Sequence, residues 1–149
     1  FIVEGLHALN PTLSDLPTNK MYKLYICPTT SFYIGDEEII SYMNLRFMRR
    51  CIRDFYTRAK TIEDTAESWK EVTDAEKIYI TPYIKDANYI VDSTHMYEPL
   101  LYALYLKPIL DKSKDNETAK NLSNMLSKCE TLKKNIIPND SLLNEFITK

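Results

Sequence analysis

The arginines of this chain are concentrated in one short stretch, whereas its lysines are spread along the whole sequence. The stretch runs from residue 46 to 58 and contains Arg46, Arg49, Arg50, Arg53 and Arg58. Arginine presents a rigid, permanently charged fork that matches phosphate oxygens, and a phosphoryl transfer needs such groups around the equatorial oxygens. The stretch therefore predicts a phosphate clamp. The alternative is a solvated helix surface whose charges are partly paired by Asp54 and Glu63.

A second candidate group is Glu4, which follows an apolar run at residues 1–3. That run is typical of a strand covered on both faces, and α/β sheets bind ligands outside the carboxyl ends of their strands. Glu4 could therefore hold Mg²⁺, which prefers hard oxygen ligands; the alternative is a carboxylate that caps a turn. The chain's only glycines are Gly5 and Gly35, so a glycine-rich phosphate loop is excluded and side chains must bind any phosphate.

The remaining composition narrows the class of protein. Cys27, Cys51 and Cys129 are far apart and form no CxxC motif, so we expect reduced thiols, and two histidines are too few for a histidine-based metal site. No apolar run reaches the roughly 18 residues that span a bilayer, and the expected location is the cytosol. A net charge of −2 argues against broad binding to nucleic acid.

Strands alternating with helices predict an α/β fold with a mainly parallel sheet. We expect strands at residues 1–3, 21–27 and 88–93, and helices at about 37–58, 61–78 and 96–110. A further amphipathic helix is marked by Leu122, Met125, Leu126, Cys129 and Leu132, and a tail helix would be capped by Asp140 or Ser141. Three strands are few for such a sheet, which predicts that this chain is a fragment of a larger domain.

The expected helix at about 37–58 is the most regular segment. Its apolar positions recur every three or four residues: Leu45, Met48, Ile52 and Phe55. At about 100° per residue these positions share one side, and Arg46, Arg49, Arg50 and Arg53 fall on an arc roughly opposite. We therefore expect one buried face and one exposed cationic face. Asp54 lies four residues from both Arg50 and Arg58, so part of the charge is expected to be paired within the helix.

Two other features concern helix starts. Asp36, Glu37 and Glu38 would place acids in the first turn of the helix at about 37–58, where they complement the helix dipole. Thr61 and Asp64 predict a variant of the capping box at the start of the helix at about 61–78.

Several segments occur in an order that matches a known family. They are FIVEGLHALNP, LYIC, LRFMRRCIRDFYTRAKTIEDTAESW, EKIYITPYIKDANYIVDS, YEPLLYALYLKPIL and IPNDSLLNEFI. In this order they resemble the uridine kinase and phosphoribulokinase family of P-loop kinases, over nearly all of the chain. The resemblance is greatest to a long-chain branch that carries a domain similar to the N-terminal part of threonyl-tRNA synthetase.

The resemblance implies a fold and an organisation. The chain would be the C-terminal part of a single uridine kinase-like domain, with a P-loop kinase-like parallel sheet. A helical lid would occupy about 36–60 and a C-terminal helical extension about 112–149. The Walker A loop and the acidic base precede this segment in the family. We therefore expect the missing N-terminal half as a partner, and no phosphoryl transfer by this chain alone.

The resemblance also implies cofactors and residue roles. ATP and Mg²⁺ would be the cofactors, and a nucleoside, uridine or cytidine, the substrate. Arg50, Arg53 and Arg58 match the catalytic lid arginines. The nucleotide would be bound by Arg49, Arg53 and Arg58, the acceptor by Arg50 and Lys60, and the metal by Glu4.

The chain departs from the family pattern at two places. Where uridine kinases read Arg-Gly-Arg, this sequence has Arg58, Ala59 and Lys60, and Ser68 stands where a glutamine is expected before Trp69. A different small hydroxyl substrate is therefore an alternative. A second alternative is a non-catalytic remnant that binds nucleotide or RNA. A sheet edge left exposed would also allow a homo-oligomer.

Overall fold

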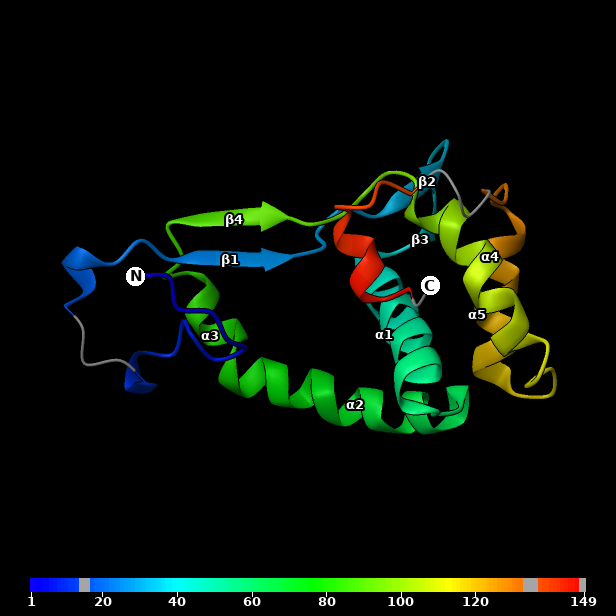
Figure 1. The fold of residues 1–149 in the computed structure, drawn as a ribbon, viewed down its shortest axis with the longest axis horizontal. Helices are drawn as coiled ribbons and strands as arrows, with labels where there is room; N and C mark the ends of the chain where they lie inside the picture. Colours follow the sequence, from blue (N-terminus) through cyan, green and yellow to red (C-terminus); the bar gives the residue numbers. More distant parts are fainter. Residues whose placement is uncertain (14–16, 133–136, 148–149) are drawn as a thin grey trace.

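The computed structural model describes residues 1–13, 17–132 and 137–147, and shows a mixed α/β chain (Figure 1). The elements are β1 (Leu24–Cys27), β2 (Phe32–Ile34), β3 (Glu37–Ile40), α1 (Tyr42–Arg58), α2 (Ile62–Tyr79), α3 (Thr81–Ile84), β4 (Tyr89–Asp92), α4 (Glu98–Leu110) and α5 (Glu117–Ser127). Short 3-10 turns lie at Pro11–Leu13, Thr18–Lys20 and Leu142–Glu145. No helix of these described residues is long and apolar enough to cross a membrane.

The parallel sheet consists of β1 and β4, paired from Leu24 with Tyr89 to Cys27 with Asp92. Both strands were expected from the sequence, and both are confirmed in shortened form. Because they are parallel, their carboxyl ends meet at one edge. There Asp92 accepts hydrogen bonds from the backbone N–H groups of Thr29 and Thr94, which joins the two loops that leave the sheet.

The expected strand at residues 1–3 is wrong. This segment has no strand conformation, and Phe1, Ile2 and Val3 are exposed. A strand that is apolar on both faces needs paired neighbours and a covering layer. In the described part of the chain, β1 pairs with β4 alone, so the apolar run finds neither.

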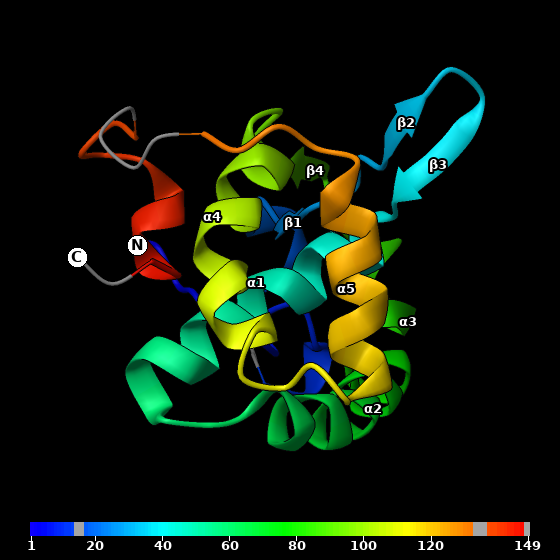
Figure 2. The same ribbon diagram turned by 90° about the vertical axis from the view of Figure 1, so that its right-hand side faces the viewer.

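The start of the long helix was also predicted wrongly. Residues 37–40 form β3, which pairs antiparallel with β2, and the helix starts at Tyr42. Strand-forming residues flank a tight turn in which Gly35 has a left-handed φ of 60°. Ser41 caps α1 by accepting a hydrogen bond from the Asn44 N–H at 3.1 Å. Figure 2 shows the hairpin projecting from the helices, where Glu37 forms an ion pair with Lys128.

The other helices follow the sequence pattern more closely. Thr61 and Asp64 form the expected capping box at the start of α2. The helix α4 spans almost the expected range, whereas α5 ends at Ser127, before Cys129 and Leu132. Ser141 caps the tail, which is a 3-10 turn of four residues.

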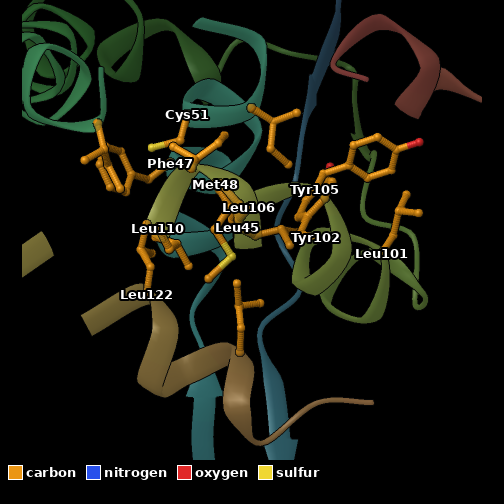
Figure 3. Close-up of a cluster of buried hydrophobic side chains, with 14 of the residues drawn as sticks. Leu45, Phe47, Met48, Cys51, Leu101, Tyr102, Tyr105, Leu106, Leu110 and Leu122 are labelled. Atoms are coloured by element: carbon orange, nitrogen blue, oxygen red, sulfur yellow. The ribbon is translucent and has the colours of Figure 1, made fainter. Parts of the chain in front are cut away.

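The hydrophobic core lies among the helices, with α1 at its centre. Figure 3 shows Leu45 and Met48 of α1 beside Leu106 and Tyr102 of α4. Other members come from α5 and from the tail: Ala119, Leu122, Leu126, Leu143 and Ile147. The sheet contributes little to this core, since Leu24, Ile26, Tyr89 and Ile90 are exposed. The helix that carries the arginines is therefore held from several sides.

Candidate functional site

The arginines of α1 do not form the exposed cationic face that the sequence predicted. Four of them lie in ion pairs: Arg46 with Glu76, Arg49 with Glu98, and Arg50 and Arg58 with Asp54. The difference arises because α2 and α4 pack beside α1 and bring Glu76 and Glu98 to its polar side. Glu63, which the alternative interpretation paired with the arginines, accepts a hydrogen bond from Ser113.

Arg49 enters the core as one half of a buried ion pair. Its side chain is 7% exposed and that of Glu98 is 0% exposed. The pair is bidentate, with Nε donating to one carboxylate oxygen at 2.8 Å and Nη2 to the other at 2.6 Å. Burial alone lowers the pKa of Arg49, but the hydrogen bonds and charge of Glu98 outweigh it and raise the pKa above its usual value. Arg49 therefore remains charged inside the protein.

Asp54 pairs with the arginines one helical turn before it and one turn after it, Arg50 and Arg58. Its side chain is 0% exposed, and its oxygens accept hydrogen bonds from Arg50 Nε at 2.9 Å and Arg58 Nη1 at 2.8 Å. The expected pairing within the helix is thus confirmed. A carboxylate between two guanidinium groups reduces their mutual repulsion and holds both at the end of α1.

Arg53 lies between Arg50 and Arg58 in the sequence, and in the described part of the chain its guanidinium group is less completely hydrogen-bonded than theirs. Among the described residues, its Nε is buried without a hydrogen-bond acceptor. Burial and the positive charges of Arg58 and Arg50 lower the pKa of Arg53, although the negative charges of Asp54 and Glu145 act in the opposite direction. An added oxyanion would supply an acceptor and relieve this repulsion.

We call the set Arg50, Arg53, Asp54 and Arg58 the arginine cluster. It contains three positive groups and one negative group, so it keeps excess positive charge at the carboxyl-terminal end of α1. Arginine forks bind phosphate oxygens bidentately. The arginine cluster can therefore bind a multiply charged oxyanion such as a phosphate group.

Lys60 lies directly after the cluster, in the turn that ends α1. Its backbone N–H donates to the carbonyl oxygen of Asp54 at 3.1 Å, and the N–H of Ala59 bonds to the same oxygen. Ala59 takes a left-handed conformation with φ 53°. The turn therefore brings Lys60 to the same end of the helix as Arg58.

Glu4 is not brought to the arginines. It is exposed, and its segment packs near the end of α2, where His7 meets the ring of Tyr79 edge-to-face at 6.2 Å. In Figure 1 this blue segment is well separated along the long axis from the carboxyl-terminal end of α1. The described residues contain no group of three or more metal-ligating side chains. Glu4 therefore belongs to no cluster of metal-ligating side chains among the described residues, and its assignment to Mg²⁺ stays a prediction.

The acidic residues of α2 and α4 that pair with the arginines were not predicted from the sequence. Glu98 was missed, although it is the one acid between Asp92 and Asp111 and begins an apolar, tyrosine-rich segment. A lone carboxylate in such a segment indicates a buried charged partner. Glu76 carried no comparable signal, because it lies among the many charged residues of α2.

Comparison with known proteins adds an independent observation. A family model described as Phosphoribulokinase / Uridine kinase family matches residues 1–98, about two thirds of the 149 residues. The chain belongs to this family. The match includes the whole arginine cluster, Glu76 and Glu98. No solved structure matches the chain.

Family membership gives the cluster a context. The family consists of kinases, which transfer a phosphoryl group and use ATP, so a phosphate-binding group of side chains is expected in its members. The arginine cluster at the end of α1 is the candidate for this role among the described residues.

The left-handed conformation of Ala59 yields a testable prediction. A non-glycine residue in this region costs roughly 1 kcal/mol, so Ala59→Gly should raise the free energy of unfolding by about 0.5–1 kcal/mol. The matched control is Ala75→Gly in the interior of α2, which should lower that free energy by about 1 kcal/mol. Urea unfolding measures both. A loss of stability in Ala59→Gly would contradict the conformation of this turn.

Proposed function

We propose that this chain is the C-terminal part of an ATP-dependent kinase that phosphorylates a nucleoside hydroxyl, uridine or cytidine, in the long-chain branch of its family. The observation that carries the proposal is the arginine cluster, where Arg53 has a buried Nε without an acceptor among the described residues. Family membership supports the reaction type. The order of segments resembling that branch supports the choice of substrate.

Each residue of the cluster has a proposed role. Arg50, Arg53 and Arg58 stabilise charge on the transferring phosphoryl group, with Arg53 and Arg58 on the nucleotide side. Arg50 and Lys60 face the acceptor. Arg49 was expected at the nucleotide, but its donors bind Glu98 and Ser93, so we assign it to positioning.

ATP would supply the γ-phosphoryl group, and the chain's own residues would orient and neutralise it. Asp54 bridges Arg50 and Arg58 and so holds both guanidinium groups at one end of α1, where both could meet one phosphate group. We propose the segment at about 36–60 as the lid. Since Arg49 and Glu98 join α1 to α4 and to the loop after β4, closure would move these parts together.

The role of Arg53 can be tested in the complete native protein. Arg53→Ala should lower kcat for ATP-dependent phosphorylation of uridine by about 10³-fold, because an arginine at the transferring phosphate stabilises the transition state. The matched control is Arg46→Ala on the same helix, whose side chain pairs with Glu76 on α2. This control should keep kcat close to wild type when it is assayed below its unfolding temperature. Equal rates for wild type and Arg53→Ala would contradict the assignment.

We also propose that the two-stranded sheet is completed by the N-terminal half of the kinase domain, which carries the Walker A loop. The support is physical: β1 and β4 each have an unpaired outer edge in the described chain, and Leu24, Ile26, Tyr89 and Ile90 are exposed beside them. Exposed strand edges with apolar side chains favour further strand pairing.

The intact mass and upstream peptide sequence of the native gene product test this second proposal. We expect a longer chain that contains a GxxxxGK[ST] peptide ahead of Phe1. A native chain that starts at Phe1 and has no such partner would contradict it. That result would favour a non-catalytic protein that binds nucleotide or RNA through the arginine cluster.

A further inference from the structure

We propose that Glu98 is the positioning residue of the arginine cluster, although it lies on another helix and its carboxylate binds Arg49, which is outside the cluster. Its carboxylate fixes the rotation of α1 relative to the carboxyl end of β4, and so aims Arg50 and Arg53 at the phosphate group. This inference rests on the proposed function and adds a residue to it.

The contacts of Glu98 converge from three parts of the chain. Besides the two hydrogen bonds from Arg49, its carboxylate accepts one from the backbone N–H of His95 at 2.7 Å and one from the hydroxyl group of Tyr102 at 2.7 Å. Arg49 in turn donates from Nη2 to the carbonyl oxygen of Ser93 at 2.7 Å. One buried carboxylate therefore binds α1, α4 and the loop after β4.

The position of Arg49 on the helix explains why this matters for the cluster. Arg53 follows Arg49 by four residues, so both lie on the same side of α1, one turn apart. Arg50 follows Arg49 directly in the sequence. A rotation of α1 that displaced Arg49 would turn Arg50 and Arg53 by the same angle. The bidentate geometry of Arg49 and Glu98 resists such a rotation more than a single hydrogen bond could.

A second contact also holds Arg49. Its guanidinium carbon lies 5.3 Å from the centre of the Phe146 ring, in the tail that contributes the buried Leu143 and Ile147 to the core. The guanidinium is thus held both by a carboxylate and by an aromatic ring. Parallel sheets bind ligands outside the carboxyl ends of their strands, and the loop after β4 starts there. Glu98 therefore connects this edge to the arginine helix.

The experiment uses Glu98→Gln in the complete native protein, because glutamine keeps the size and one acceptor oxygen but removes the charge. We expect kcat/KM for ATP to fall about 10–100-fold, as misplacement of positioned groups by about 1 Å can cost 10²-fold. The matched control is Glu76→Gln, which removes the corresponding charge from the Arg46 pair on the α2 side. This control should change kcat/KM less than threefold. All variants are assayed well below their unfolding temperatures.

A coupling measurement separates positioning from loss of stability. If Glu98 acts by aiming Arg53, the effects of Glu98→Gln and Arg53→Ala on kcat/KM will be less than additive in the double variant. Additive effects, or equal losses in Glu98→Gln and Glu76→Gln, would overturn the inference while leaving the proposed function intact. A wild-type protein that neither binds ATP nor phosphorylates a nucleoside would overturn the proposed function, and this inference with it.

Discussion

Desolvation of guanidinium groups is the constraint on which the rest of this structure depends. The helix α1 is central to the core, yet it carries every arginine of the chain. A charge that leaves water must be paired and hydrogen-bonded, or its burial becomes very unfavourable. Glu98 and Asp54, both with 0% side-chain exposure, satisfy this requirement for Arg49 and Arg50, and Asp54 also pairs with the half-exposed Arg58. The packing of α4 beside α1 therefore depends on the ion pair between Arg49 and Glu98.

The same constraint divides the arginines into two groups: those that join α1 to neighbouring helices and those at the carboxyl-terminal end of α1. Those in the middle of α1 face neighbouring helices that supply a carboxylate each, so Arg46 and Arg49 hold the helices together. Near the carboxyl-terminal end of α1, Asp54 pairs with Arg50 and Arg58 and also acts on Arg53, which Glu145 of the tail influences as well. The partial negative charge of the helix end helps to keep the three arginines there. The excess positive charge of α1 is thus concentrated at its carboxyl-terminal end, where a bound phosphate group could neutralise it.

Much of this architecture could be predicted from the sequence where the signal is local. Thr61 and Asp64 are three residues apart, and Asp54 is one turn from both Arg50 and Arg58, so the capping box and the pairing within the helix followed from spacing alone. The β2–β3 hairpin was missed because the acids at 36–38 were assigned to a helix. The pairing of Arg49 with Glu98 joins residues 49 positions apart, and periodicity cannot show which helix packs on a polar face.

A crystal structure of the complete native protein with ADP would test the central claim most directly. The account predicts terminal phosphate oxygens within hydrogen-bond distance of the guanidinium groups of Arg53 and of Arg50 or Arg58, with Asp54 still bridging the latter two. It also predicts that Arg49 stays bound to Glu98. Nucleotide phosphates bound elsewhere, with the arginine cluster empty, would contradict the account.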